Sequence, residues 1–182
     1  MEISRVARLT KGGSGLTFPS RYSTFNDSIR PRGRSMGEDV AGESKTVDQV
    51  LDSTLESVDK AERAALDLAR ESGFGDEDLD RIGMSVREGM VNAVVHGNRY
   101  NAHKKVRLSV SRTPERLTIR IADQGEGFNP GELPDPVSGD NLMRHSGRGI
   151  FLMRAFMDDL QVRRLDPAGT EVTLVKNVVA KK

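Results

Sequence analysis

The sequence predicts an α+β domain, a two-layer sandwich of a mostly antiparallel sheet with its helices on one face. Apolar residues recur at helical spacing between positions 57 and 98, and later they alternate with polar residues in several short segments. The later strands are expected to pair as hairpins rather than to alternate with helices, which disfavours a Rossmann-type sheet. Hydrophobic residues make up 36% and charged residues 30% of the 182 residues, as expected of a globular protein with a core.

Residues 1–45 differ in composition from the rest of the chain. They are rich in Gly, Ser and Thr, and no period of 2 or 3.6 holds for long, so we expect a flexible N-terminal extension. A solvated linker is a better interpretation than a binding arm, although scattered Arg residues make the middle of the extension basic. The ordered domain is expected to span residues 46–182.

The ordered region is expected to begin with a strand over residues 47–51 and a helix over residues 57–70, which glycines then end. A second helix is predicted from about residue 76 to residue 98. Asp76 is its expected N-cap, and the acidic residues that follow suit the positive end of the helix dipole. Gly97 and Asn98 are expected to close it.

The second half of the chain predicts two hairpins around a long loop and a short helix. Residues 106–110 and 117–121 alternate apolar and polar positions across a turn. A loop from residue 123 to 147 is too long for an ordinary connection, so we expect a functional lid. A third helix over residues 149–157 and strands over 160–165 and 171–175 complete the domain.

The second helix carries Glu88, Asn92 and His96 at steps of four, which places a carboxylate, an amide and an imidazole on one line of an α-helix. Neighbouring positions are apolar, and buried polar groups need partners. A cleft that holds a metal and phosphates would supply such partners. A solvated helix face explains the same spacing equally well when the spacing is considered alone.

Asp123 stands at the end of a predicted strand and is followed by Gly125 and Gly127. Glycine allows positive φ and lets a ligand approach the backbone, and a carboxylate there can accept a hydrogen bond from an exocyclic amine. Taken alone, the motif favours an ordinary turn.

Two further glycine-containing segments lie downstream. Gly147, Arg148 and Gly149 open the third helix, where free backbone N–H groups can bind phosphate and Arg148 adds a permanent charge. A glycine-rich helix entry is the alternative. Gly169 and Thr170 lead into the last strand, and alone they indicate only a hairpin turn.

Composition and missing motifs exclude several classes of protein. The chain has no cysteine, which excludes disulfides, thiol catalysis and cysteine-ligated zinc. The net charge of +1 supports neither nucleic-acid nor membrane-surface binding. No apolar stretch is long enough for a membrane span, and no signal-peptide core begins the chain, so we expect a cytoplasmic protein. P-loop and protein-kinase signatures are both absent.

In this order, the four motifs resemble the GHKL superfamily of gyrase, heat-shock chaperone and histidine-kinase ATPases, over about residues 46–176. Glu88 and Asn92 resemble its N-box, and the glycine motifs that follow resemble its glycine boxes. Within the superfamily, the Ala-x-x-His-Gly run that contains His96 is similar to bacterial anti-sigma-factor serine/threonine kinases. The family's fold is the α+β sandwich that the periodicity predicts.

The resemblance implies an ATP site with Mg²⁺. Asn92 would hold the metal ion, and Asp123 would bind the adenine amino group with Thr170 nearby. Gly125 and Gly127 would let the base approach.

The resemblance also implies phosphate contacts from Gly147, Arg148 and Gly149, and it places His96 among the ATP-binding residues. Glu88 would accept the proton of a protein Ser or Thr hydroxyl as that hydroxyl attacks the γ-phosphate.

The function implied is that of an ATP-dependent serine/threonine kinase acting as an anti-sigma factor in a partner-switching system. Its partners would be a sigma factor and an anti-sigma-factor antagonist, and a homodimer is expected. The alternative is a nucleotide-gated module that sequesters a partner with little kinase turnover. A detached histidine-kinase ATPase domain is disfavoured because nothing before Thr46 resembles the helical hairpin that carries the phosphorylated histidine.

Overall fold

The computed structural model describes residues 43–127 and 145–179 of the chain. In chain order, its elements are β1 (Lys45–Asp52), α1 (Glu56–Glu71), α2 (Asp76–Val91), the π-helical segment η3 (Asn92–Gly97), β2 (Lys105–Arg112), β3 (Arg116–Ala122), α3 (His145–Phe156), β4 (Asp159–Arg164) and β5 (Thr170–Asn177). This order confirms the predicted α+β class. The expectations for the N-terminal extension and for most of the long loop fall on residues 1–42 and 128–144, outside the described residues.

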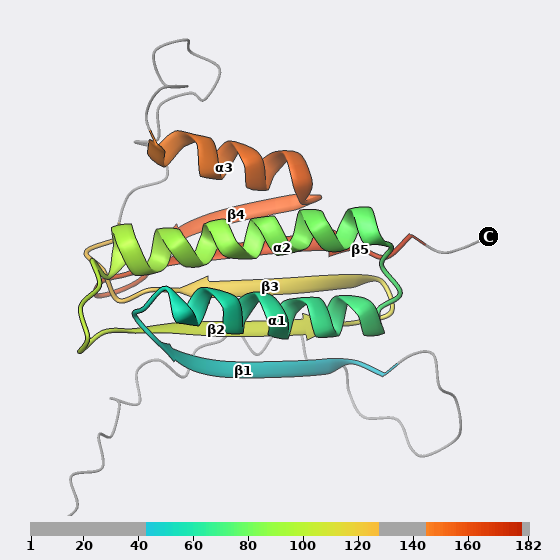
Figure 1. Ribbon diagram of the computed structural model, residues 1–182, viewed down its shortest axis with the longest axis horizontal. Helices are drawn as coiled ribbons and strands as arrows, with labels where there is room; N and C mark the ends of the chain where they lie inside the picture. Colours follow the sequence, from blue (N-terminus) through green and yellow to red (C-terminus); the bar gives the residue numbers. More distant parts are fainter. Residues whose placement is uncertain (1–42, 128–144, 180–182) are drawn as a thin grey trace, which may run out of the picture. The chain divides into compact units, whose positions relative to one another are not determined.

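The five strands form one antiparallel sheet in the order β1-β2-β3-β5-β4. Figure 1 shows the helices packed together against this sheet, with α2 between α1 and α3. In the central β3–β5 pair, Ala122 lies opposite Glu171 at one end and Arg116 lies opposite Asn177 at the other. The end of β3 and the start of β5 therefore meet at the same end of the sheet.

The hydrophobic core lies between the helices and the sheet. Every second residue of β2, β3 and β5 faces it, as the alternation predicts. Helix α2 packs so closely on β3 that a Cβ at Gly89 would lie 2.8 Å from Cδ1 of Ile121. The largest fully buried side chains are Ile82, Met90, Leu108, Leu117, Ile119, Ile121, Met153, Leu174, Val58, Val86, Val94 and Val106.

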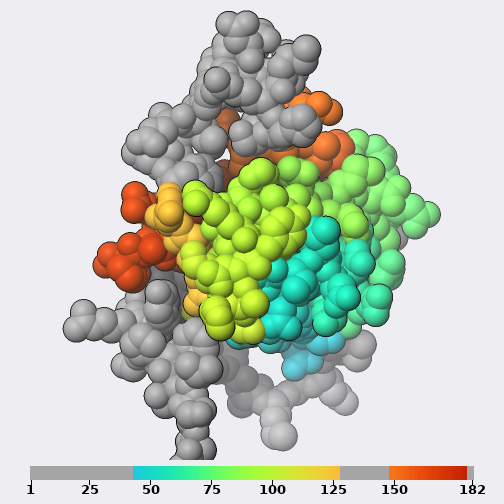
Figure 2. All heavy atoms as spheres, turned by 60° about the vertical axis from the view of Figure 1, so that its left-hand side comes forward, coloured from blue at the N-terminus to red at the C-terminus, as the bar shows by residue number. Residues whose placement is uncertain are grey.

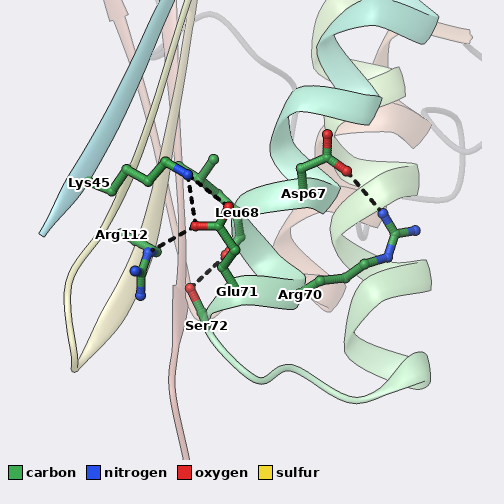
Figure 3. A network of polar contacts seen from close by, with 7 residues as sticks. All are labelled: Lys45, Asp67, Leu68, Arg70, Glu71, Ser72 and Arg112. Carbon is green, nitrogen blue, oxygen red and sulfur yellow. Dashed lines mark hydrogen bonds and ion pairs between the residues drawn. The ribbon is translucent and has the colours of Figure 1, made fainter. Parts of the chain in front are cut away.

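The C-terminal end of α1 is tied to the sheet edge by an exposed polar network (Figure 3). Nζ of Lys45 on β1 donates to Oε1 of Glu71 over 2.8 Å, and Nε of Arg112 on β2 lies 3.5 Å from Oε2 of the same carboxylate. The hydroxyl of Ser72 donates to the Leu68 carbonyl over 2.8 Å and caps the helix end. Exposed ion pairs of this kind add little to stability.

Three helix boundaries differ from the predictions. Gly75 rather than Asp76 is the N-cap of α2, and no side chain caps this end; the acidic residues lie in the first turn instead. Helix α3 begins at His145, earlier than the glycine motif indicated. The second helix ends as an α-helix at Val91 and continues as a π-helix, because the N–H of Asn98 bonds to the Ala93 carbonyl five residues back, over 2.8 Å.

Among the residues that the structure describes, no helix is long and apolar enough to cross a membrane.

Candidate functional site

Asp123 lies directly after β3, at the end of the sheet where β5 begins. Its side chain is buried, and Oδ1 accepts hydrogen bonds from the N–H of Gly125 over 2.8 Å and from the N–H of Thr170 over 3.1 Å. The N–H of Asp123 in turn donates to the Thr170 carbonyl over 2.9 Å. Both of these backbone donors bind the same carboxylate oxygen, Oδ1.

Burial raises the pKa of the Asp123 carboxyl above its ordinary value. The backbone N–H groups of Gly125 and Thr170, the charge of Lys104 and the Thr170 hydroxyl act in the opposite direction but do not cancel it. A desolvated carboxyl of this kind, whose Oδ1 already accepts two backbone hydrogen bonds, is suited to bind a ligand that offers a hydrogen-bond donor.

Glycines let the backbone close around this carboxyl. A Cβ at Gly97 would lie 2.5 Å from Cγ of Asp123, and a Cβ at Gly125 would overlap the carbonyl oxygen of Gly97. Gly127 and Gly169 have φ of 75° and 114°, in the left-handed region, and a Cβ at Gly127 would lie 2.6 Å from the Gly169 carbonyl oxygen. The structure thus brings Gly97, the Asp123 motif and the β4–β5 turn together.

The same segments lie side by side on the surface of the molecule. Figure 2 shows the residues near position 125, in amber, next to the β4–β5 hairpin in orange-red and the yellow-green residues that follow η3.

The other half of the candidate site lies where α2 passes α3. Glu88 is half-buried, and a Cβ at Gly149 would overlap its carboxylate and lie 2.6 Å from its Cγ. Glu88 therefore packs directly against the backbone of α3. Gly147 and the exposed Arg148 belong to the preceding turn of the same helix. The structure thus brings Glu88 and the glycine motif of α3 together.

Asn92 and His96 lie on η3, between these two halves. Asn92 is half-buried and begins the π-helical segment one turn after Glu88, whereas His96 is exposed near its end. The segment starts at Asn92, one turn after Glu88, and ends at Gly97, against Asp123.

The sequence did not reveal the polar residues that anchor the end of η3. Asn98 is buried, its Nδ2 donates to the Lys105 carbonyl over 3.0 Å, and its Oδ1 accepts from the N–H of Gln124 over 2.8 Å. In the sequence, the only sign of this contact is that Asn98 follows Gly97 and Gln124 lies inside the Asp123 motif. The spacing of these two amide residues does not indicate that they meet.

Within the described residues, no group of three or more His, Asp and Glu side chains could hold a metal ion. Mg²⁺ bound to a nucleotide takes one or two protein oxygens and completes its octahedron with phosphates and water. The half-buried Asn92 amide provides an oxygen donor of this kind. The donor set therefore fits a magnesium ion brought in with a nucleotide.

Residues 51–176 match the model of the family described as "Histidine kinase-like ATPase domain". The chain belongs to this family. The match to the histidine kinase-like ATPase domain begins in β1 and ends in β5, so it includes every element that carries the candidate site.

Curated relatives of this ATPase domain include proteins named "Anti-sigma F factor" from Bacillus thuringiensis (strain Al Hakam), Bacillus mycoides (strain KBAB4) and Bacillus anthracis (strain A0248). Each is 33% identical over 102 residues, which are 55% of this chain and 70% of the relative.

Proposed function

We propose that this chain is an ATP-dependent serine/threonine protein kinase that acts as an anti-sigma factor in a bacterial partner-switching system. The observation that carries the proposal is the arrangement of a buried Asp123 at one end of η3, with Asn92 at its other end and Glu88, one turn earlier, packed against α3. Membership of the ATPase family and the names of the curated relatives support the same proposal.

The adenine end of ATP is assigned to the Asp123 half of the site. Oδ2 of Asp123 would accept a hydrogen bond from the exocyclic amino group, with Thr170 beside it. Gly125 and Gly127 are assigned to the same end of the site, where a side chain at either position would collide with the backbone of Gly97 or Gly169 and push apart the segments around Asp123. The exposed His96 is proposed as a further contact of the nucleotide.

The phosphates are assigned to α3 and η3. The backbone N–H of Gly147, in the first turn of α3, would bind the phosphates, and Arg148 would neutralise their charge. Gly149 belongs to the same proposed phosphate-binding motif, but it lies one turn further into the helix, where the absence of a side chain leaves room for Glu88. The amide of Asn92 would hold Mg²⁺, which supplies charge neutralisation across the phosphates when it is bound.

Glu88 is the proposed general base. Its carboxylate would take the proton of a Ser or Thr hydroxyl on the substrate protein while the hydroxyl oxygen bonds to the γ-phosphorus. The bond from this phosphorus to the β–γ bridging oxygen breaks, and ADP leaves with that oxygen. Its position against Gly149 supports this role because it puts the carboxylate beside the proposed phosphate-binding backbone rather than at the adenine end.

The proposed partners are a sigma factor and a small antagonist protein whose Ser or Thr receives the phosphate. We further propose a homodimeric cytoplasmic protein with its catalytic domain in residues 46–182 and a flexible extension before it. No direct role in binding nucleic acid or membranes is proposed.

The test is Glu88→Gln, which keeps the size of the side chain and removes the basic oxygen. ATP should still bind, whereas phosphate transfer from labelled ATP to a partner antagonist should slow by at least about a hundredfold. Glu77→Gln is the matched control, since it makes the same change at an exposed position of α2 that pairs with Arg81. Asn92→Ala should instead weaken the Mg²⁺-dependent binding of ATP itself. Full transfer by both site variants would contradict the assigned roles.

A nucleotide-gated module with little kinase turnover is the second candidate. The relatives named "Anti-sigma F factor" support this candidate as well, because an anti-sigma factor can act by binding alone. It becomes the better account if the wild-type chain binds ATP and a sigma factor but transfers no phosphate to any candidate antagonist.

A further inference from the structure

The end of η3 is joined to two other segments by a ring of side-chain and backbone hydrogen bonds, here called the amide clamp and formed by Asn98, Gln124 and Lys105. Oδ1 of Asn98 accepts from the N–H of Gln124 over 2.8 Å, and Nδ2 of Asn98 donates to the carbonyl of Lys105 over 3.0 Å. The ring is closed by the N–H of Lys105, which donates to Oε1 of Gln124 over 2.7 Å. Asn98, Gln124 and Lys105 come from three separate segments, and each of them is hydrogen-bonded to the other two.

The amide clamp is built into the interior rather than placed on the surface. Asn98 is only 1% exposed, and Gln124 and Lys105 are half-buried. A buried amide that fulfils both its donor and its acceptor capacity is costly to replace, because its partners would be left unsatisfied. The clamp therefore restrains the positions of the backbone groups it joins.

The backbone beside the clamp also requires restraint. Arg99 and Tyr100, which follow Asn98, have φ of 54° and 55° in the left-handed region that side-chain-bearing residues disfavour. Such a turn persists only where its surroundings hold it. Asn98 is the buried residue that anchors its start.

The amide clamp lies directly beside the proposed adenine-binding carboxyl. Gln124 follows Asp123 in the chain, and Gly97 precedes Asn98. The Asp123 carboxyl fits against Gly97 so closely that a Cβ there would lie 2.5 Å from Cγ. The hydrogen bond between Gln124 and Asn98 therefore fixes the separation of the two backbone segments between which this carboxyl sits.

We propose that Asn98 and Gln124 are positioning residues that set adenine selectivity by holding the Asp123 carboxyl against the end of η3. This inference rests on the proposed function, in which Asp123 binds the exocyclic amino group of adenine. Loosening the clamp should then remove the energetic advantage of that amino group while it leaves the rest of the nucleotide bound.

The test compares the binding of ATP and of inosine triphosphate, which carries an oxygen in place of the amino group, by calorimetry with Mg²⁺ on the full chain. The wild type should prefer ATP by at least about tenfold, the usual scale for a hydrogen bond to a charged group. Asn98→Ala should weaken ATP binding at least about fivefold and leave inosine triphosphate binding within about twofold, so that the preference collapses.

Gln124→Met opens the clamp at one bond, because it removes the acceptor for the Lys105 N–H and keeps the backbone N–H that Gln124 donates to Asn98. It should reduce the preference for ATP, and it keeps the proposal testable if Asn98→Ala does not fold. Gln124→Glu keeps the acceptor for the Lys105 N–H and should retain the preference. Asn101→Ala is the matched control, because Oδ1 of Asn101 also accepts a backbone hydrogen bond, from His103 over 2.9 Å, but in an exposed turn outside the clamp.

The outcomes separate the two proposals. A wild type that binds no ATP, or binds both nucleotides equally, overturns the proposed adenine contact and the clamp's role with it. A wild type that prefers ATP, together with clamp variants that keep this preference or lose both nucleotides equally, overturns only the positioning role. A selective loss in Gln124→Met or Asn98→Ala, with the preference kept in Gln124→Glu and Asn101→Ala, supports it.

Discussion

The ionisation of Asp123 is disfavoured by the fold in the absence of a ligand. Burial raises its pKa, so the folded state binds the proton more tightly than the unfolded state does. The stabilising contribution is fully present below the unfolded value of 3.8 and is lost as the pH rises through the higher folded pKa. At neutral pH a buried carboxylate therefore opposes folding, in a position where a bound amino group would stabilise it.

Asp123→Asn should weaken the binding of ATP while the protein stays folded. The amide oxygen can still accept from the N–H groups of Gly125 and Thr170, so the fold should be retained. Relative to the wild type, the free energy of unfolding of the variant should increase between about pH 3 and about pH 7, because the titration that destabilises the wild type is removed. Urea unfolding at both pH values measures this difference.

The same variant should bind ATP more weakly by about 1.5–3 kcal/mol, the range for a lost hydrogen bond to a charged group. Calorimetry on the folded variant measures the affinity. A stability difference that does not change with pH would show that Asp123 has no raised pKa, and an unchanged affinity would remove it from the adenine site.

Gly125→Ala should disrupt the site through backbone contact alone. The added Cβ would overlap the carbonyl oxygen of Gly97 and lie 2.7 Å from its carbonyl carbon, and the amide clamp restrains the residues next to both glycines, Gln124 and Asn98. We expect a loss of about 1–3 kcal/mol in the free energy of unfolding, the usual cost of overpacking, and a loss of ATP binding. Gly75→Ala, where a Cβ meets nothing within 4 Å, is the control and should cost less than Gly125→Ala. Equal unfolding midpoints for the two variants would contradict this contact.

At the scale of elements, the sequence predicted what periodicity reports. The type and order of the helices and strands followed from which positions face the core, and the Glu88–Asn92 spacing followed from the geometry of an α-helix. The π-helical turn could not be predicted in this way. Its hydrogen bond to the residue five positions back is made by Asn98, whose side chain is also bound to Gln124, 26 residues away in the chain. The exposed His96 lies on the same segment, so the sequence did not predict its position in a π-helix either.

The contact between α2 and α3 is predicted to control the proposed base. Gly149→Ala would drive its Cβ into the Glu88 carboxylate, which is the free end of a flexible side chain and can turn away. The free energy of unfolding should therefore change by less than about 1 kcal/mol, the scale of the helix-propensity difference between Gly and Ala. Phosphate transfer at saturating ATP should fall at least about tenfold, because a misplaced catalytic group loses much of its effect.

A matched variant on α2 controls for the added methyl group. A Cβ at Gly83 would also face a carboxylate, Oε1 of Glu62 at 3.1 Å, but this contact lies between α1 and α2 and away from the proposed site. Gly83→Ala should leave the transfer rate unchanged. If Gly149→Ala transfers phosphate at the wild-type rate, the packing of Glu88 on α3 has no part in the chemistry.

At the scale of the whole domain, one end of the sheet carries the candidate site and the other end carries a buried lysine that links several elements. The candidate site lies where Ala122 pairs with Glu171, whereas Lys176 lies opposite Leu117 near the other end of the same strand pair. The Lys176 side chain is only 10% exposed. Its Nζ donates to the Phe156 carbonyl over 3.1 Å and lies 3.2 Å from Asp78 and 3.6 Å from Asp158. This one ammonium group joins the start of α2, the segment after α3 and the last strand.

Lys176→Met should therefore destabilise the fold without affecting the nucleotide site. The substitution keeps an apolar stem of similar length but leaves Asp78 and Asp158 without their shared cation. We expect the free energy of unfolding to fall by about 1.5–3 kcal/mol, the scale of a hydrogen bond to a charged group. Lys45→Met removes an exposed ion pair to Glu71 instead, so its effect on the urea midpoint should be much smaller. ATP affinity, measured by calorimetry well below the unfolding transition, should equal that of the wild type in both variants. Weaker ATP binding in folded Lys176→Met would mean that the two ends of the sheet are coupled, since β3, β5 and the helices packed on them join Lys176 to Asp123.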